Sequence, residues 1–158
     1  MLFPYKDDNP RVLVPYVTYG IITMNVIVFI FQFNLGMSNP MGEENFIYRF
    51  GFVPANFSFI AIFTSMFLHG GFSHIMGNMW FLWVFGDNVE GVLGHAKYAL
   101  FYILCGLAAT ISQLLINPGS TIPMVGASGA IAGVLGMYMI RFPNANVHVF
   151  AFIIIFFT

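Results

Sequence analysis

Long apolar segments, each bounded by a short polar stretch, run along most of this 158-residue chain. Residues 12–33 contain no charged side chain and reach the length of about 20 apolar residues that a membrane-spanning helix requires. Similar runs predict helices over residues 73–90, 96–116 and 128–141, and the apolar residues 147–158 predict the start of a fifth helix. The pattern therefore predicts an all-α protein that crosses a membrane several times.

The fifth apolar run is shorter than the others. It holds only a dozen residues, fewer than the roughly 20 that a helix needs to cross a membrane. We therefore expect a single membrane domain over residues 1–158 that is incomplete at its C-terminus, with about four and a half spanning helices in this chain.

Residues 34–56 break the pattern of spanning helices. Asparagine, glycine, proline and the pair Glu43-Glu44 indicate a loop, but the sequence NFIYRFGFVPANF is too aromatic for a fully solvated one. Aromatic side chains such as tyrosine favour the boundary between lipid and water. We therefore predict an interfacial loop over residues 34–56.

The composition agrees with insertion into a membrane. Charged residues make up 7% of the chain and hydrophobic residues 59%, whereas ordinary soluble domains carry about 25% charged residues. The net charge of −1 gives no basis for binding nucleic acid. Cys105 is the only cysteine, so we expect no disulfide framework and interpret this residue as a small buried apolar side chain.

The basic residues predict how the chain is oriented in the membrane. With the N-terminus in the cytoplasm, Lys6, Arg11, Lys97 and Arg141 lie on the cytoplasmic side and only Arg49 lies outside. Cytoplasmic loops of membrane proteins carry an excess of lysine and arginine. We therefore expect a cytoplasmic N-terminus, in the plasma (inner) membrane of a prokaryote.

Three polar side chains are predicted at a similar depth inside the membrane. If Glu90 marks the cytoplasmic end of its helix, Asn78 lies about 18 Å and His74 about 24 Å above it. If Arg141 marks the cytoplasmic end of the next short helix, Ser128 lies about 20 Å above that end. The apolar core of a bilayer is about 30 Å thick, so the loop before Ser128 must enter the membrane and lie against protein or a water-filled cavity.

The sequence HIMGN places two hydrogen-bonding side chains on one helix face. His74 and Asn78 lie four residues apart, so they project from the same side of the helix. An imidazole and a carboxamide at the depth of a serine could donate hydrogen bonds to the oxyanion of an acyl-transfer intermediate. The alternative is that the pair bonds to a neighbouring helix and only stabilises the bundle.

The sequence GASGAIAGVLG allows two interpretations of Ser128. Gly129, Gly133 and Gly136 repeat at helical spacing, and the first two form a G-x-x-x-G motif that lets helices pack closely. Close packing does not explain a serine at the start of the helix. Free backbone N–H groups and the positive end of the helix dipole would stabilise an oxyanion there, so Ser128 is our candidate nucleophile.

A metal or transport site is a further alternative. His69 and His74 lie near four methionines that could act as soft ligands: Met66, Met76, Met79 and Met124. Methionine more often fills gaps in a packed core, so we predict packing and no metal. His95 and His148 are expected to have solvated structural roles, and Glu90 is expected to pair at the end of its helix.

Together these motifs resemble the rhomboid family of intramembrane serine proteases. The resemblance runs from about Tyr48 to Arg141. YRFGFVPA resembles the end of the family's first loop, FLHGGFSHIMGNMWFLWVFGDNVEGVLG its second helix, and GASGAIAGVLG its serine motif. The order of an upstream histidine, HxxxN, E-x-x-x-G and the serine motif makes the resemblance specific.

The resemblance implies a catalytic role for three residues. Ser128 would be the nucleophile of a peptide-bond hydrolysis in or near the transmembrane segments of substrate proteins. The Ser128 backbone N–H, His74 and Asn78 would form the oxyanion hole. The reaction would need no metal and no nucleotide, and the partners would be transmembrane proteins and the lipid bilayer.

The resemblance also implies the surroundings of the site. His69 would be structural, ahead of the second helix, and Gly126 and Gly129 would allow the close approach around the serine. The implied fold is a rhomboid-like bundle with a core of six transmembrane helices.

One departure from the family pattern concerns the general base. The family uses a Ser–His dyad whose histidine lies on the sixth helix, beyond Thr158, so we expect this chain alone to be inactive. A serine without a base is a poor nucleophile at neutral pH. The alternative function is that of an inactive rhomboid-like protein that binds transmembrane clients.

Overall fold

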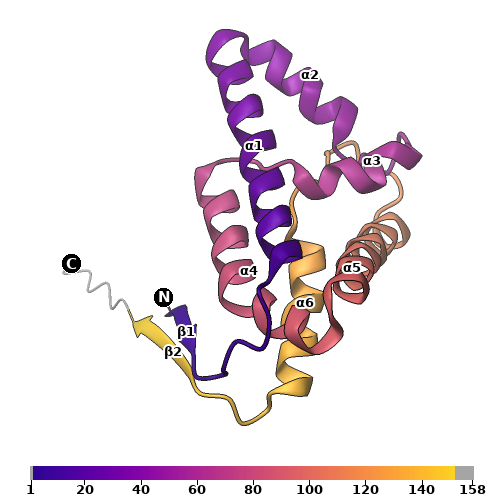
Figure 1. The fold of residues 1–158 in the computed structure, drawn as a ribbon. Coiled ribbons are helices and arrows are strands. Elements are labelled where there is room, and N and C mark those ends of the chain that lie inside the picture. Colours follow the sequence, from indigo (N-terminus) through magenta and orange to yellow (C-terminus); the bar gives the residue numbers. More distant parts are fainter. Residues whose placement is uncertain (1, 152–158) are drawn as a thin grey trace, which may run out of the picture.

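The computed structural model describes residues 2–151 as a helical bundle with shorter helices at one end and two short strands at the other (Figure 1). The bundle consists of α1 (Tyr16–Ser38), α4 (Phe72–Leu93), α5 (His95–Ile116) and α6 (Ser128–Arg141). The shorter helical elements are α2 (Pro40–Phe50), α3 (Phe59–Thr64) and the 3-10 helix η1 (Ser65–Phe67). The strands are β1 (Leu2–Asp7) and β2 (Val147–Ala151).

Within residues 2–151, two helices are long and apolar enough to cross a membrane. α1 has 23 residues and α5 has 22, and both contain the apolar window of a spanning helix. The segment Phe59–Phe67 and α4 form a pair bent by 85°, which would make a third span if both belong to one crossing. These helices confirm the predicted helical membrane bundle.

The fourth predicted helix is short and begins inside the bundle. α6 has the predicted bounds, and its 14 residues extend about 21 Å, less than the roughly 30 Å of a bilayer core. In Figure 1 the loop after α5 runs down into the bundle before α6 begins. The loop before Ser128 therefore lies against protein within the bundle, and its depth in the membrane stays a prediction.

The predicted interfacial loop over residues 34–56 contains a helix that the sequence analysis missed. α1 continues to Ser38, and α2 follows it directly. The side chain of Asn39 caps α2 by accepting a hydrogen bond from Gly42 N–H at 3.0 Å, and Pro40 lies in the first turn. Asparagine followed by proline is a typical helix start, so the signal was present in the sequence.

The predicted fifth helix is wrong over the part that the structure describes. Val147–Ala151 is a strand, β2, which pairs antiparallel with β1. Periodicity cannot separate a strand from a helix in so short an apolar run, and Val147 and Val149 have the β-branched side chains that favour strands. Residues 152–158 of the predicted helix lie outside the described residues.

α6 packs against both α4 and α5. On the α5 side, Gly129 lies against Ala109 and Gly133 lies against half-buried Cys105, too close for a Cβ atom on either glycine. This confirms the close packing predicted from G-x-x-x-G. Gly136 has open space around it among the described residues. The buried side chains of α6 are Ala130, Ile131, Val134 and Tyr138.

Glu90 of α4 caps the N-terminus of α1. Its fully buried carboxylate accepts hydrogen bonds from Val17 N–H at 2.9 Å, Thr18 N–H at 2.8 Å and the Thr18 hydroxyl at 2.7 Å. The first N–H groups of a helix have no partner within that helix, so another helix supplies one here. His95 Nδ1 lies 2.5 Å from the same carboxylate. Glu90 therefore has the pairing role that we expected at the end of its helix, and His95 has the expected structural role.

We predict that Glu90→Gln lowers the free energy of unfolding of the full-length protein by about 2–4 kcal/mol. Glutamine presents an NH₂ group to donors that now face a carboxylate, and each buried donor left without a partner costs about 1–3 kcal/mol. Reversible unfolding in detergent micelles measures the change. Glu44→Gln, at an exposed position of α2, is the matched control. An equal loss in both variants would contradict the capping role.

Candidate active site

Backbone hydrogen bonds hold the loop between α5 and α6 inside the bundle. Phe52 N–H donates to Met124 O at 3.0 Å, and Met124 N–H donates to Phe52 O at 2.8 Å. Gly126 N–H donates to Ser65 O at 2.8 Å. Irregular backbone at membrane depth requires partners of this kind. The chain is therefore fixed by protein contacts as it descends to Ser128.

Ser128 is the first residue of α6, and its side chain is exposed. No side chain in the described part of the chain caps this helix, and its first backbone hydrogen bond runs from Ile131 N–H to Ala127 O at 3.0 Å. The N–H groups of Ser128 and Gly129 therefore have no partner within the helix. A cavity of about 120 Å³ adjoins the serine, and its lining includes Ser65, Met66, Gly106, Thr110, Met124 and Ala130.

Gly126 brings the loop between α5 and α6, which we call the serine loop, against His74 and Asn78. Its φ of +120° lies in the left-handed region that side chains with a Cβ avoid. A Cβ at this position would lie 2.8 Å from both Cε1 and Nε2 of His74 and 3.5 Å from Asn78 Nδ2. The structure therefore brings the two predicted α4 residues to the backbone two residues before Ser128.

The hydrogen bonds of His74 determine which ring nitrogen can donate. Gly70 N–H donates to His74 Nδ1 at 3.3 Å, so the neutral ring carries its proton on Nε2, the atom that faces Gly126. Asn78 is 8% exposed, and its buried Nδ2 has no hydrogen-bond partner within residues 2–151. Two N–H donors of α4 thus face the serine loop.

His69 supports this arrangement from the loop before α4. Its side chain is fully buried, and its ring meets the His74 ring edge-on with centroids 5.1 Å apart. Gln32 of α1 holds the His69 backbone, because its Nε2 donates to His69 O at 2.6 Å and its Oε1 accepts from His69 N–H at 3.3 Å. The sequence analysis missed Gln32, although a polar residue within an apolar span is a signal of function or structure.

Comparison with known proteins shows which family carries this arrangement. The family model described as the Rhomboid domain matches residues 56–158, which is more than half of the chain. The chain belongs to the rhomboid family. This confirms the resemblance carried by the motifs and identifies the chain as part of an integral membrane protein.

Several relatives bear rhomboid names. Identity is 30% to "Rhomboid protein 1, mitochondrial" of Saccharomyces cerevisiae, over 95% of this chain and 42% of that protein. Bacillus subtilis YdcA, which bears the name of a rhomboid protease, is also 30% identical, over 84% of this chain and 66% of that protein. "Rhomboid protease GluP" of Bacillus subtilis is 30% identical over 77% of this chain and 24% of its own length. The chain thus spans less than two thirds of each relative, and no solved structure matches it significantly.

The four methionines of the alternative metal site do not all lie together in this rhomboid chain, although Met66 and Met124 line the same cavity. Met66 and Met79 are buried in the core, whereas Met76 is 65% exposed on α4. Met124 lines the cavity beside Ser128. In residues 2–151, no three histidine, cysteine, aspartate or glutamate side chains form a group of metal-binding size. Packing explains the buried methionines.

His148 lies in β2, the strand that follows α6. Its Nε2 is 2.8 Å from Asp8 Oδ1, and this hydrogen bond holds the pKa of Asp8 below its ordinary value. Both side chains are nearly half exposed. The pair agrees with the solvated structural role expected for His148.

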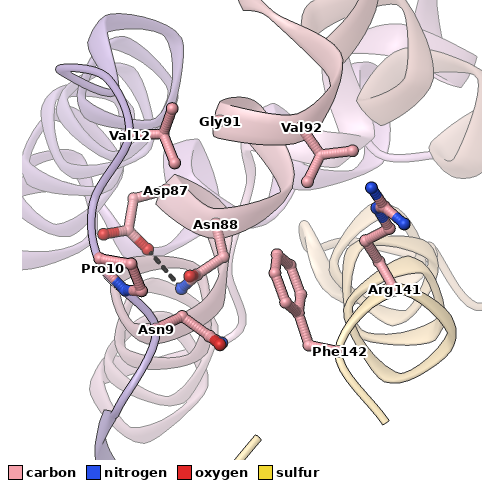
Figure 2. Close-up of a pocket in the computed structure, with 9 residues that line it drawn as sticks. All are labelled: Asn9, Pro10, Val12, Asp87, Asn88, Gly91, Val92, Arg141 and Phe142. Carbon is pink, nitrogen blue, oxygen red and sulfur yellow. Dashed lines mark hydrogen bonds between the residues drawn. The ribbon is translucent and has the colours of Figure 1, made fainter.

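A larger cavity, of about 420 Å³, lies at the other end of α6 (Figure 2). Arg141 and Phe142 line it from α6 and the residue that follows, and Asp87 and Asn88 line it from α4. Asn88 Nδ2 donates to Asp87 Oδ1 at 3.0 Å, and the other Asp87 oxygen pairs with Arg11 at 3.3 Å. None of the predicted site residues lines this cavity, so the candidate rhomboid active site is the smaller cavity at Ser128.

We predict that Gly126→Ala destabilises the protein by about 1–3 kcal/mol, since the methyl group would collide with the His74 ring and the positive φ would be strained. The free energy of unfolding of the full-length protein measures this. Gly119→Ala is the matched control, because Gly119 lies in the same loop with open space around it and no positive φ. Equal stability of the two variants would show that His74 does not pack on Gly126.

Proposed function

We propose that the full-length protein is an intramembrane serine protease that hydrolyses peptide bonds in or near the transmembrane segments of other membrane proteins. The observation that carries this proposal is the convergence at Gly126. Two donors of α4, His74 Nε2 and Asn78 Nδ2, face the loop that leads to the exposed Ser128. Membership of a family with protease-named relatives, such as GluP, supports the same reaction class.

In this mechanism the Ser128 hydroxyl attacks the carbonyl carbon of the scissile peptide. The tetrahedral intermediate carries negative charge on the former carbonyl oxygen, and N–H groups already in place stabilise that charge. The Ser128 backbone N–H, His74 Nε2–H and the Asn78 NH₂ group supply these donors. The positive end of the α6 dipole adds to the stabilisation.

The cavity beside Ser128 has room for the water that hydrolysis requires. Its volume of about 120 Å³ exceeds the share of about 30 Å³ that one water molecule takes in the liquid. As the tetrahedral intermediate collapses, the peptide C–N bond breaks and the amine leaves with the proton that the general base took from Ser128. Water in this cavity then hydrolyses the acyl-enzyme to the carboxylic acid and free Ser128.

The general base is proposed to be a histidine on a later helix, outside this chain. His74 is unsuited to that role, because Nδ1 accepts from Gly70 and the neutral ring already carries a proton on Nε2. The exposed Ser128 and Ala132 and the open Gly136 form a face of small residues on α6. Small residues let helices approach closely, which would bring a base on that later helix within reach of Ser128.

The proposal includes a membrane and an orientation of the chain in it. We propose a prokaryotic plasma (inner) membrane with the N-terminus in the cytoplasm, an orientation that Lys6, Arg11, Lys97 and Arg141 support. With this orientation, the predicted depth places Ser128 in the outer half of the membrane. Transmembrane proteins are the proposed substrates, and no cofactor enters the mechanism.

Ser128→Ala tests the proposal in the full-length protein. We expect cleavage of a reporter with a labile transmembrane segment to fall by roughly 10⁴-fold or more, because the nucleophile is gone. Ser112→Ala, at an exposed position of α5, is the matched control and should cleave at the parent rate. Unchanged cleavage in Ser128→Ala would contradict the proposal. A parent protein that binds the reporter without cutting it would instead indicate a client-binding rhomboid-like protein.

A further inference from the structure

One peptide group connects α1 to His74. The peptide between His69 and Gly70 has its carbonyl oxygen 2.6 Å from Gln32 Nε2, and its N–H donates to His74 Nδ1 at 3.3 Å. A peptide group is planar, so its C=O and N–H turn together. Gln32 therefore fixes the plane of this peptide, and the peptide fixes both the ring orientation and the tautomer of His74.

A carboxylate of the interfacial helix orients Gln32. The Gln32 side chain is buried, and its Oε1 accepts from His69 N–H, which leaves the NH₂ group of the same carboxamide to donate. That NH₂ group donates to His69 O and, at 3.2 Å, to Glu43 Oε1. A flip of the carboxamide would break all of these bonds, because a buried amide needs acceptors at its NH₂ group and donors at its oxygen.

The place of Glu43 is set by the packing of α2 on α1. The two helices meet at the end of the bundle farthest from the strands (Figure 1), and α2 contacts α1 there. The Glu43 carboxylate lies directly on Gly36 of α1, where any Cβ would displace it. Glu44, the next residue in the sequence, is exposed. Glu43 thus reaches Gln32 because α1 has a glycine at position 36.

We propose that Glu43 is a positioning residue for the oxyanion hole. Through Gln32 and the His69–Gly70 peptide, it holds His74 with its Nε2–H directed at the serine loop. This inference rests on the proposed function, in which His74 stabilises the oxyanion. It assigns helix α2 a part in catalysis through contacts within the protein.

Steady-state cleavage by the full-length protein tests the kinetic consequence. We expect Glu43→Ala to lower kcat about fivefold and to leave KM unchanged, because an interaction that acts on the transition state alone has been weakened. Glu43→Gln should retain most of the activity, since its side-chain carbonyl still accepts from Gln32. Glu44→Ala is the matched control and should match the parent. Gly36→Val, which displaces the carboxylate without removing it, should reproduce Glu43→Ala.

A second readout does not depend on cleavage. Nitrogen-15 NMR of the full-length protein labelled at histidine reports which ring nitrogen carries the proton, and the His74→Gln spectrum identifies the His74 signals. We expect the Nε2–H tautomer in the parent, Glu43→Gln and Glu44→Ala. Glu43→Ala and Gly36→Val should show a mixture with the Nδ1–H tautomer, because the Gly70 N–H is no longer held on Nδ1.

The two readouts separate this inference from the proposed function. If Ser128→Ala cleaves normally, the protease proposal fails, and the His74 spectra still decide whether Glu43 controls the ring. Parent-like His74 signals in both Glu43→Ala and Gly36→Val would overturn the inference. So would a variant Glu43→Ala that unfolds more easily while its folded fraction keeps the parent kcat. An activity loss in Glu43→Gln as large as that in Glu43→Ala would also overturn it.

Discussion

Backbone N–H and C=O groups within a membrane must find partners in the protein, and the loop before α6 finds them in Phe52 and Ser65. These bonds let the chain descend into the bundle before it becomes helical. α6 then begins inside the bundle, and Ser128, its first residue, lines a cavity. The left-handed turn at Gly126 completes the descent and lays the backbone on His74 and Asn78. The geometry of the candidate site thus follows from the hydrogen bonds that the backbone of this buried loop needs.

Polar contacts at both ends of α1 join it to α4 and to the segment just before α4. α4 carries His74 and Asn78, which lie against this loop. At one end, the buried carboxylate of Glu90 caps α1. Towards the other end, Gln32 binds the backbone of His69, just before α4 begins. Buried polar groups are costly unless every partner is present, so these contacts fix α1 and α4 in one register. The segment of His69 and Gly70 and the loop that leads to Ser128 are therefore held in fixed positions by α1 and α4. Fixed positions suit a site that works through preorganised donors.

Local patterns predicted much of the fold and of the site. The bounds of α6 and the shared face of His74 and Asn78 follow from helix periodicity and spacing, which depend only on neighbours along the chain. The pairing of Gln32 with His69 joins residues 37 apart in the sequence, and Glu90 caps a helix start more than 70 residues earlier. Such contacts depend on tertiary packing, and so does strand β2, whose short apolar run requires β1 as a partner. The roles of the site residues remain predictions.

The accessibility of position 128 tests most directly whether Ser128 faces water deep in the membrane. In a full-length protein without other cysteines, Ser128→Cys should react with a membrane-impermeant thiol reagent added from the outer side. Ile111→Cys, on the exposed face of α5 at a similar predicted depth, should stay unlabelled. Labelling of Ser128→Cys from the outer side alone is the predicted result. No labelling of that variant, or labelling only from the cytoplasmic side, would contradict the account.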